Sequence, residues 1–565
     1  MRRPALTSPS IILLPAMVLC LLTTWRDGQC QEETCRSLAE ANPDAVISRI
    51  TIDLRKIIEP ADGFPAWFPS DRIQKLHIPT AEKTIRRELL FKEGERLDPD
   101  IVEETRRNLR ALGYFRDEAM ECRLCQDETV EVIVHLKETW SLVPIFSMRG
   151  VGGHQSVTGG LAEKNLFGWG KSLSAAYRSG LDYENVFIDE SWTVSYSDPN
   201  VMGSRLNFST TLQKLQSGES VSGVFQRPFY SLETSWAGAL SGSHLKRRPP
   251  LIINGTTVAD YIRVDNEAAV FAAIALNPGA PRIHRIGALY TYKEKSIRDF
   301  EPLPAASALG SPPPAPRGYT TSGPGLSYRG LGVHYVREER ISRFDRTEDL
   351  NMGNDLALTV SASLEALGAS RDECVFSLTD SQGYRFREGH LLMGKLTAYG
   401  RWDGRKAEDT KLSFRSDYFL RDTPLDAGVF LHTLHASVSC GYGVGLSSDT
   451  LFSLGWDTGL RGFASGSFTG NKLFLVSVED RVFVSRHFFG LLAVGLVPFW
   501  DAGSVWEEGK DIAASDLRHA LGVGIRLGLP SCAGENILKV DLGFPLGKRY
   551  SLGDCVVTLV TSTTF

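Results

Sequence analysis

The carboxyl-terminal part of the chain alternates between apolar residues and polar or small residues with a period of two. Along residues 517–529, one set of alternating positions holds leucine, valine, isoleucine and one histidine, and the other holds arginine, glycine and alanine. Successive side chains of a strand point to opposite faces, so this pattern predicts strands with one apolar face. Residues 472–484, 492–506 and 537–544 repeat it less regularly. An apolar outer face with a polar or small inner face is typical of transmembrane β-barrels.

The same alternation assigns a face to two carboxylates, Glu479 and Asp501. Both fall on the more polar face of their predicted strands, which is the inner face of a barrel. Arg461 precedes them in the run Leu460-Arg461-Gly462-Phe463. One arginine upstream of two inward carboxylates indicates a β-barrel with a loop held inside its lumen, and the alternative is a set of unrelated lumen charges.

Length and composition are those of an envelope protein with at least two structural units. The chain has 565 residues, more than one ordinary globular core accommodates. After residue 24, no apolar run approaches the 18 or so residues that a spanning helix requires. The net charge of −5 gives no indication of a nucleic-acid partner. Residues 1–30 begin with arginines followed by a short apolar stretch, which predicts a secretory signal peptide.

Other chemistry-bearing residues do not form a convincing site. Nine cysteines are present, and the only short spacing, Cys122-Arg-Leu-Cys125, lacks the second pair that a zinc or redox site requires. Some cysteines could pair outside the cytoplasm, so their pairing stays open. His432 and His435 are three residues apart and would face opposite sides of a strand. We therefore expect no enzyme activity, no metal site and no cofactor.

Residues 46–140 have the pattern of a small α+β domain, preceded by a linker at residues 31–45. Thr80 is the expected N-cap of its first helix, and Gly94 and Gly113 are expected to end the two helices. The proline of Asp98-Pro99 suits the first turn of the second helix. The predicted elements are, in order, a strand, two helices and two strands, at residues 46–54, 85–91, 98–112, 115–124 and 128–138. An exposed edge of such a sheet can accept an extended client segment as an extra strand.

The domain resembles a POTRA (polypeptide-transport-associated) domain in its element order and in three runs of sequence. These runs are Ile85-Arg86-Arg87-Glu88-Leu89, the segment 108–115 (Asn-Leu-Arg-Ala-Leu-Gly-Tyr-Phe) and Lys137-Glu138-Thr139-Trp140. With this domain in place, the rest of the chain resembles the BamA/TamA superfamily of outer-membrane assembly barrels, also called the bacterial surface antigen family. The runs that carry this second resemblance are 165–170 (Asn-Leu-Phe-Gly-Trp-Gly), 197–200 (Ser-Asp-Pro-Asn), 460–463 (Leu-Arg-Gly-Phe), 478–481 (Val-Glu-Asp-Arg) and 499–503 (Phe-Trp-Asp-Ala-Gly).

The resemblance implies a barrel of sixteen antiparallel strands at residues 141–565. In that family the arginine motif lies at the tip of the sixth extracellular loop, which folds into the lumen and meets acidic residues of strands twelve and thirteen. By resemblance these residues are Arg461, Glu479 and Asp501, with Gly462 allowing the turn and Phe463 packing against the wall. Phe565 resembles the terminal aromatic residue of outer-membrane targeting signals. We also expect outer loops at residues 246–259 and at the proline-rich residues 300–325.

A function follows from the edges of the barrel. A weak seam between the first strand, at residues 141–150 with Pro144, and the last, at residues 555–565, would open to offer unpaired backbone groups to a client strand. The expected function is assembly or translocation of unfolded outer-membrane or exported polypeptides in the outer membrane of a Gram-negative bacterium, with the POTRA domain in the periplasm. Outer-membrane lipid, lipopolysaccharide and accessory envelope proteins are the other expected partners. A dedicated secretion pore and a surface receptor or adhesin are the alternatives.

Overall fold

The computed structural model describes most of the chain as two compact units. The described residues are 31–33, 35–58, 74–75, 77–125, 128–151, 154–181, 190–309, 313–344, 346–421, 423, 425–485, 487–488, 492–534, 537–547, 550–551 and 554–562. The expected signal peptide and Phe565 lie outside them. Unit 1 contains the described parts of residues 1–55, 89–108 and 117–136, and unit 2 contains the remainder. None of the described helices has the length and apolar character needed to cross a membrane.

The described elements of the amino-terminal region are four strands and three helices. The strands form one sheet in the order β1-β3-β4-β2, so β1 and β2 lie at its edges. The elements are β1 (Gln31–Glu33), α1 (Cys35–Ala41), β2 (Ile47–Arg55), α3 (Glu82–Glu88), α4 (Pro99–Ala111), β3 (Phe115–Leu124) and β4 (Val130–Glu138). Residues 31–45, treated above as a linker, thus contain β1 and α1. A disulfide between Cys35 and Cys122 joins α1 to β3.

The helix boundaries differ from the sequence prediction at both ends of α3 and agree at the start of α4. Helix α3 begins at Glu82, so Ala81 and not Thr80 occupies the N-cap position, and the Thr80 hydroxyl and backbone N–H both donate to the Glu138 carboxylate. Helix α3 ends at Glu88, so Gly94 does not close it and lies in a later turn with φ of +90°. Asp98 does cap α4, because its Oδ1 accepts the Asp100 backbone N–H at 2.8 Å.

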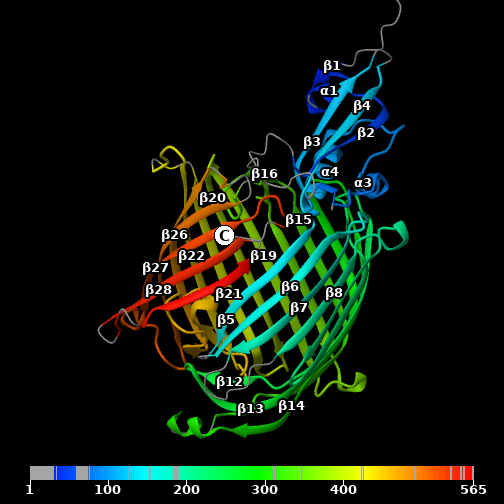
Figure 1. Cartoon of the computed structure of the whole chain (residues 1–565). Coiled ribbons are helices and arrows are strands. Elements are labelled where there is room, and N and C mark those ends of the chain that lie inside the picture. The colour runs from blue at the N-terminus through cyan, green and yellow to red at the C-terminus, as the bar shows by residue number, and fades with distance from the viewer. Residues whose placement is uncertain are drawn as a thin grey trace, which may run out of the picture. The chain divides into compact units, whose positions relative to one another are not determined.

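Unit 2 is dominated by a closed antiparallel β-barrel (Figure 1). Each barrel strand pairs with the next barrel strand along the chain, except that β11 and β12 both pair with β13, and the last strand pairs with the first. Its strands are β5 (Leu142–Val151), β6 (His154–Leu166), β7 (Lys171–Leu181), β8 (Ser191–Asp198), β9 (Asn207–Leu215), β10 (Gly218–Arg227), β11 (Trp236–Arg247), β12 (Pro250–Ile253), β13 (Thr256–Ala275), β14 (Arg282–Pro302), β15 (Tyr319–Gly332), β18 (Asp355–Ser363), β19 (Glu373–Arg387), β20 (His390–Trp402), β21 (Ala407–Arg421), β22 (Phe430–Val444), β25 (Lys472–Val484), β26 (Ala493–Trp506), β27 (Arg518–Gly528), β28 (Ile537–Leu546) and β29 (Val556–Ser562). We call the end at which β5 begins the near end and the opposite end the far end. The predicted fold class, a small α+β domain followed by a barrel, is confirmed.

The predicted number of sixteen strands is wrong for this barrel. The described residues form twenty-one barrel strands, and β11 and β12 share one position because both pair with β13, which leaves twenty positions around the wall. The loop that carries Arg461 lies between β22 and β25, and five strands follow it. Five strands would also follow the sixth outer loop of a sixteen-strand barrel. The four strand positions beyond sixteen therefore precede the Arg461 loop. Counted from β5, this loop is the eighth at the far end.

Of the two predicted outer loops, the first is largely strand and the second is shorter than predicted. Residues 246–259 contain β12 and the start of β13, joined by the tight turn of Asn254 and Gly255 with φ of 48° and 78°. Positive φ at both central residues is the conformation that favours the Asn-Gly pair in two-residue hairpins. In the proline-rich segment, β14 continues to Pro302 and β15 begins at Tyr319, and a short 3-10 helix, η3 (Pro304–Leu309), lies in the shorter loop between them.

The alternation of side chains in the last strands is as predicted. On β25, Ser477 and Arg481 are buried on the lumen side, whereas Val478 is exposed on the outer side. On β27, Leu521 and Ile525 are exposed and Arg526 is buried. Residues far apart in sequence that share the lumen face are thereby brought together inside the barrel.

The junction of β29 with β5, which we call the closing seam, is paired much less than its neighbours. Among the described residues, β29 and β5 are in register only at Leu559 and Met148. By contrast, β5 pairs with β6 along its whole length, from Leu142 to Val151. Among the described residues, the closing seam therefore has fewer register partners than the junctions on either side of it.

Candidate functional site

The loop between β22 and β25, residues 445–471, is a folded element that we call the lumen loop. Its two short strands, β23 (Phe452–Leu454) and β24 (Phe468–Gly470), pair with each other. Between them lies a short 3-10 helix, η5 (Trp456–Thr458), and the backbone N–H of Trp456 donates to the Phe463 carbonyl at 2.9 Å. The tip is thus shaped by the loop's own hydrogen bonds, which lowers the entropy lost when it binds the wall.

Arg461, at the tip of the lumen loop, contacts both predicted carboxylates. Its Nε and Nη2 donate to the two Asp501 oxygens at 2.8 and 2.7 Å, and its Nη1 donates to Glu479 Oε1 at 2.7 Å. Ser477 Oγ accepts a further bond from Nη2 at 3.0 Å and donates to Asp501. The bidentate pairing uses the planar fork of donors that only arginine offers. The structure therefore brings Arg461, Glu479 and Asp501 into one cluster, which we call the Arg461 clamp.

The Arg461 clamp is buried. Arg461 is 9% exposed and Asp501 is fully buried, and the guanidinium lies 3.6 Å from the ring centre of Phe499. Burial opposes the charge of Arg461, but the hydrogen bond to Asp501 and the charge of Glu479 outweigh it and raise the pKa of the guanidinium above its ordinary value. Removing one partner of a buried pair typically costs about 3–5 kcal/mol because the other charge is left without compensation.

The residues that follow Arg461 fit the tip closely against the wall. Gly462 has φ of +91°, and a Cβ there would lie 3.1 Å from Ala520 Cβ. A Cβ on Gly543 of β28 would lie 2.5 Å from the Gly462 backbone nitrogen, so two glycines allow this approach. Phe463 is buried, and its ring packs edge-on against Phe468 of the same loop and Tyr550 of another far-end loop. Phe463 also belongs to a buried apolar cluster with Leu475 of β25 and Ala520 of β27, so it lies against wall residues as well as loops.

A second layer of charges continues from the clamp toward the near end. Arg481 Nε donates to the second Glu479 oxygen, Oε2, at 3.0 Å, so Glu479 is shared by two arginines. Arg481 Nη2 also donates to His435 Nδ1 at 3.0 Å, which leaves His435 Nε2 to donate to Asp417 at 2.9 Å. The alternation of the sequence places these side chains on the lumen face, but no sequence feature identified them as partners of the Arg461 clamp.

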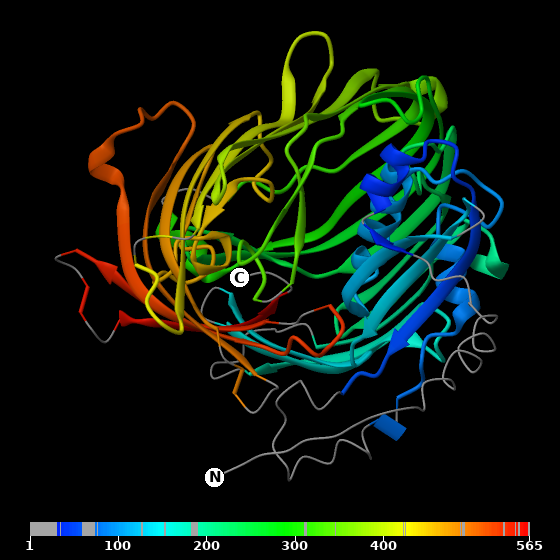
Figure 2. The same ribbon diagram turned by 90° about the horizontal axis from the view of Figure 1, so that it is seen from above.

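A hairpin that the sequence did not predict enters the lumen from the near end. Its strands β16 (Tyr335–Glu338) and β17 (Glu348–Asn351) pair with each other, in the connection between β15 and β18. We call residues 335–351 the inner hairpin, and the view along the barrel shows chain segments within the ring of strands (Figure 2). Arg481 Nη1 donates to the Ile341 carbonyl at 2.6 Å. One chain of contacts, Arg461 to Glu479 to Arg481 to Ile341, thus links the two inserted elements.

The tip of the inner hairpin is fixed by one carboxylate and one aromatic ring. Glu348 Oε1 accepts the backbone N–H groups of residues 341, 342 and 343, which folds the tip onto its own strand. Phe344 is 2% exposed and packs against Phe483 and Ile537 of the wall. A Cβ on Gly528 would lie 2.6 Å from the Phe344 ring, so this glycine leaves room for it. Phe483 is an apolar residue on a lumen face, and the inner hairpin is its partner.

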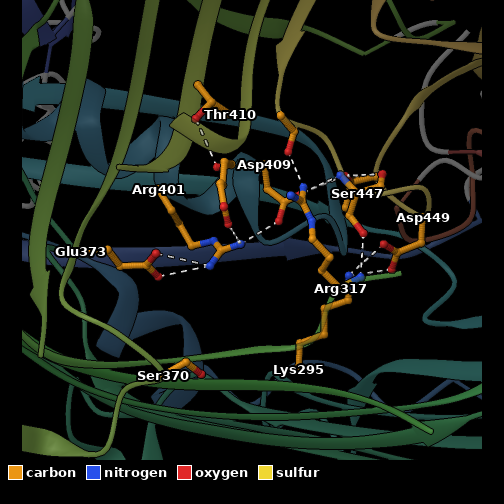
Figure 3. A network of polar contacts seen from close by, with 12 residues as sticks. Lys295, Arg317, Ser370, Glu373, Arg401, Asp409, Thr410, Ser447 and Asp449 are labelled. Carbon is orange, nitrogen blue, oxygen red and sulfur yellow. Dashed lines mark hydrogen bonds and ion pairs between the residues drawn. The ribbon is translucent and has the colours of Figure 1, made fainter. Parts of the chain in front are cut away.

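A network of buried ions at the far end holds the base of the lumen loop (Figure 3). Asp449 of the loop pairs with Lys295 of β14 at 2.7 Å, and the Ser447 backbone N–H donates to Asp409 of β21 at 2.8 Å. Arg401 Nη2 donates to the same Asp409 at 2.8 Å, and its Nη1 to Glu373 at 3.2 Å. The lumen loop is therefore held at its base by this network and at its tip by the Arg461 clamp.

The ion pairs and hydrogen bonds of these clusters hold the inserted segments in place inside the barrel. All the groups of the Arg461 clamp are mutually satisfied ions and hydrogen bonds. Within the described residues, no group of three or more histidine, cysteine or acidic side chains has the arrangement of a metal site. Phe565, the predicted targeting residue, lies outside the described residues.

Comparisons of the sequence identify two domains. Residues 380–565 match the family model for the Omp85 superfamily domain, and residues 77–139 match the POTRA model, described as surface antigen variable number repeat. A search of curated proteins finds no match to the sequence. The first match spans β20 to β29 with most of β19, and so includes Arg461, Glu479 and Asp501.

Three solved structures are distantly similar to the chain. BamA from Haemophilus ducreyi lacking POTRA domains 1–3 is 15% identical, with a TM-score of 0.37 over 92% of this chain and 85% of that chain. CdiB from Acinetobacter baumannii is 12% identical, with a TM-score of 0.42 over 92% of this chain and 74% of that chain. CdiB from Escherichia coli is 11% identical, with a TM-score of 0.42 over 92% and 77%.

Proposed function

We propose that this chain, which carries an Omp85 superfamily domain at residues 380–565 and a POTRA domain at residues 77–139, inserts polypeptides into the outer membrane of a Gram-negative bacterium. The near end of the barrel faces the periplasm, and the far end faces outward. The amino-terminal domain receives an unfolded client, and the closing seam offers it an edge. The Arg461 clamp holds the lumen loop against the wall while the seam opens.

The observation that carries the proposal is the small number of register pairs at the closing seam, compared with the strands that bind Arg461. The strands that hold Glu479 and Asp501, β25 and β26, are paired along most of their length, whereas β29 and β5 are in register only at Leu559 and Met148 among the described residues. Pro144 in β5 lacks an N–H and is tolerated only at an edge or an irregular position of a sheet. A client strand that adds to β5 or β29 gains main-chain hydrogen bonds at the cost of few existing ones.

The sheet of the amino-terminal domain offers a second edge for the same client. Its outer strands are β1 and β2, and β2 extends over nine residues from Ile47 to Arg55. An extended segment pairs with such an edge through backbone groups and needs no particular sequence. This mode of binding suits a protein that handles clients of many sequences.

The second candidate function is export of one dedicated polypeptide through the lumen. The observation that favours it is the strand number, because barrels of 16–18 strands already enclose an aqueous channel and this one has twenty positions around its wall. In this function the lumen loop and the inner hairpin would both have to leave the lumen during export. They would act as plugs at the two ends.

Depletion of the protein from its bacterium, followed by quantitative mass spectrometry of outer-membrane and secreted proteins, tests the proposal. Insertion predicts a joint loss of several unrelated barrel proteins from the outer membrane. Loss of a single secreted protein with normal barrel levels would favour export instead. Unchanged levels of both would contradict both functions and favour a surface receptor or adhesin.

A further inference from the structure

A cavity of about 480 Å³ lies in the lumen between the lumen loop and the wall formed by β21, β22, β25 and β27 to β29. Five cations line it, Arg415, Arg461, Arg481, Arg526 and Lys539, together with three carboxylates, Asp457, Glu479 and Asp541. We call it the cation pocket. Positive side chains thus outnumber negative ones in a partly enclosed space.

Four of the five cations already have partners. Arg415 pairs with Asp417 through two bonds of 2.8 and 2.6 Å, and Arg526 pairs with Asp541 at 2.6 Å. Arg461 and Arg481 share Glu479, as described above. Lys539 makes neither a hydrogen bond nor an ion pair with any described residue, although it lies on the lumen face of β28. Glu479 and Asp541 act on its charge without direct contact, so Lys539 is the one lining cation of the described structure that no carboxylate pairs with directly.

The position of Lys539 makes this lack of a partner costly. Its register partner on β27 is Arg526, so two cations face each other on adjacent strands. Like charges directly opposite in a sheet destabilise it. The Arg526 Nε atom is also buried and without a hydrogen-bond partner, so a second donor beside Lys539 is unused. An anion that reaches both groups would remove both costs.

Gly524, which has no side chain, leaves room for the ion pair of Arg526 and Asp541 beside Lys539. A Cβ on Gly524 of β27 would lie 2.1 Å from Asp541 Oδ1 and 2.5 Å from Arg526 Nη1. The pair of Arg526 and Asp541 therefore occupies the volume that a side chain at 524 would take. Thr558 and Val560 of β29, a strand of the closing seam, also line the pocket.

We propose that the cation pocket binds a carboxylate, held by Lys539 and the free Nε of Arg526, and that its source is an acidic side chain of the client polypeptide. The location argues for this source, because Val560 lies on the strand to which a client would add. The inference rests on the proposed function for the source of the carboxylate but not for the anion site itself. A free anion such as phosphate has the same chemistry and is the other source that the test distinguishes.

The test uses the full chain in detergent micelles, with p-benzoylphenylalanine in place of Val560 as a photocrosslinker. The probe is the end-blocked peptide Thr-Val-Thr-Asp-Thr-Val-Thr, and its control has asparagine in place of aspartate. A charge-assisted hydrogen bond to a buried site corresponds to about tenfold in binding, so we expect about tenfold more crosslinking of the aspartate peptide. Lys539→Gln should abolish this preference. Lys214→Gln should preserve it, because Lys214 is exposed on β9 and pairs with Glu219 outside the pocket.

Equilibrium dialysis with radioactive inorganic phosphate, on wild type and Lys539→Gln, separates the two sources. Lys539-dependent phosphate binding with no preference between the peptides would support the anion site and assign it to a free anion. Equal crosslinking of both peptides, with no Lys539-dependent phosphate binding, would overturn the inference while leaving the proposed function standing. Absence of any peptide crosslink would count against polypeptide handling at this wall, and the dialysis would still report on the site.

Discussion

Arg461 directs its guanidinium nitrogens at acceptors that the barrel wall holds in fixed positions. Two bonds go to Asp501, one to Glu479 and one to Ser477, and its backbone N–H also donates to Asp501 at 3.1 Å. A lysine has a single nitrogen and could not occupy these directions at once. The arrangement explains why this position requires arginine and why the two acids come from adjacent strands.

Arg461→Ala should leave the barrel folded and release the lumen loop. The truncation leaves two buried carboxylates without their shared cation, which costs about 3–5 kcal/mol, and most of that cost is relieved if the tip moves and water enters. We expect chymotrypsin to cleave the loop near Phe463 in the variant and not in the wild type, and client insertion to fall.

The matched control for this experiment is Arg329→Ala. Arg329 also forms a two-bond pair, with Asp355, but at a position that is nearly half exposed. Exposed pairs contribute about 0–1 kcal/mol, so this variant should behave as wild type. Normal protection of the lumen loop in Arg461→Ala would contradict the clamp.

The sequence predicted the partners of Arg461 because strand parity is a local property. Glu479 and Asp501 fall on inward positions whatever the register of the neighbouring strands. Ser477 and Phe499 have the same parity and complete the clamp, but serine and phenylalanine occur on many strands and nothing marked them. Lys539 was likewise assigned an inward face, whereas its lack of a partner depends on the register of β27 with β28, which the sequence does not specify.

At the scale of elements, two inserted segments meet through a single layer of charge. The lumen loop ends at Arg461, the inner hairpin ends near Ile341, and Glu479 and Arg481 lie between them. Displacing one tip removes a partner from this layer and so weakens the attachment of the other. The lumen loop and the inner hairpin are therefore expected to be released together more readily than separately.

Glu348→Gln should loosen the inner hairpin. The charged carboxylate accepts three backbone N–H groups at the tip, and a neutral amide oxygen accepts them more weakly. We expect the conductance of the variant in planar lipid bilayers to exceed that of the wild type. The control variant is Gln213→Glu on β9, because the Gln213 side chain donates to Ser191 of β8 and not to the inner hairpin. Equal conductance of Glu348→Gln and wild type would argue against a plug.

The disulfide between Cys35 and Cys122 should stabilise the start of the amino-terminal domain. It closes a span of 87 residues, and loss of such a bond from a small domain typically costs about 2–5 kcal/mol. Replacing both cysteines by serine should speed backbone hydrogen exchange in α1, measured by mass spectrometry on the full chain. Exchange in β25 of the same sample provides the internal control and should not change. Unaltered exchange in α1 would show that the bond is dispensable.

The inner hairpin was missed because its sequence carries few of the signals of a strand pair. Residues 335–351 are rich in charges, and their aliphatic residues and phenylalanine are widely spaced, at Val336, Ile341, Phe344 and Leu350. The available signal was indirect. Leu475 and Phe483 interrupt the polar face of β25, and each of them is covered by an inserted element, the lumen loop for the first and the inner hairpin for the second. Apolar residues on the lumen face of a strand therefore indicate where an inserted segment packs against the wall.

At the scale of the whole molecule, the barrel is wider than the resemblance implied. The last six strands and the lumen loop follow the expected order, and the four additional strands lie earlier in the chain. Strand number depends on which segments pair, and residues 246–259 and 300–325 contain enough proline and glycine to read as loops although their ends are strand. The alternation of apolar and polar residues identifies a single strand, but it does not give the number of strands in a barrel where the alternation is weak.

The central claim is that clients enter through the closing seam, and a reversible lock tests it most directly. Cysteines at Met148 and Leu559, which are register partners across the seam, are introduced after the cysteines at positions 125, 374, 440, 532 and 555 are replaced by serine. A control protein carries cysteines at Leu538 and Thr561, partners on the continuous junction of β28 and β29. The readout is the rate of client barrel insertion in proteoliposomes. The account predicts that oxidation stops insertion in the seam variant alone and that reductant restores it. Full insertion by the oxidised, fully crosslinked seam variant would contradict it.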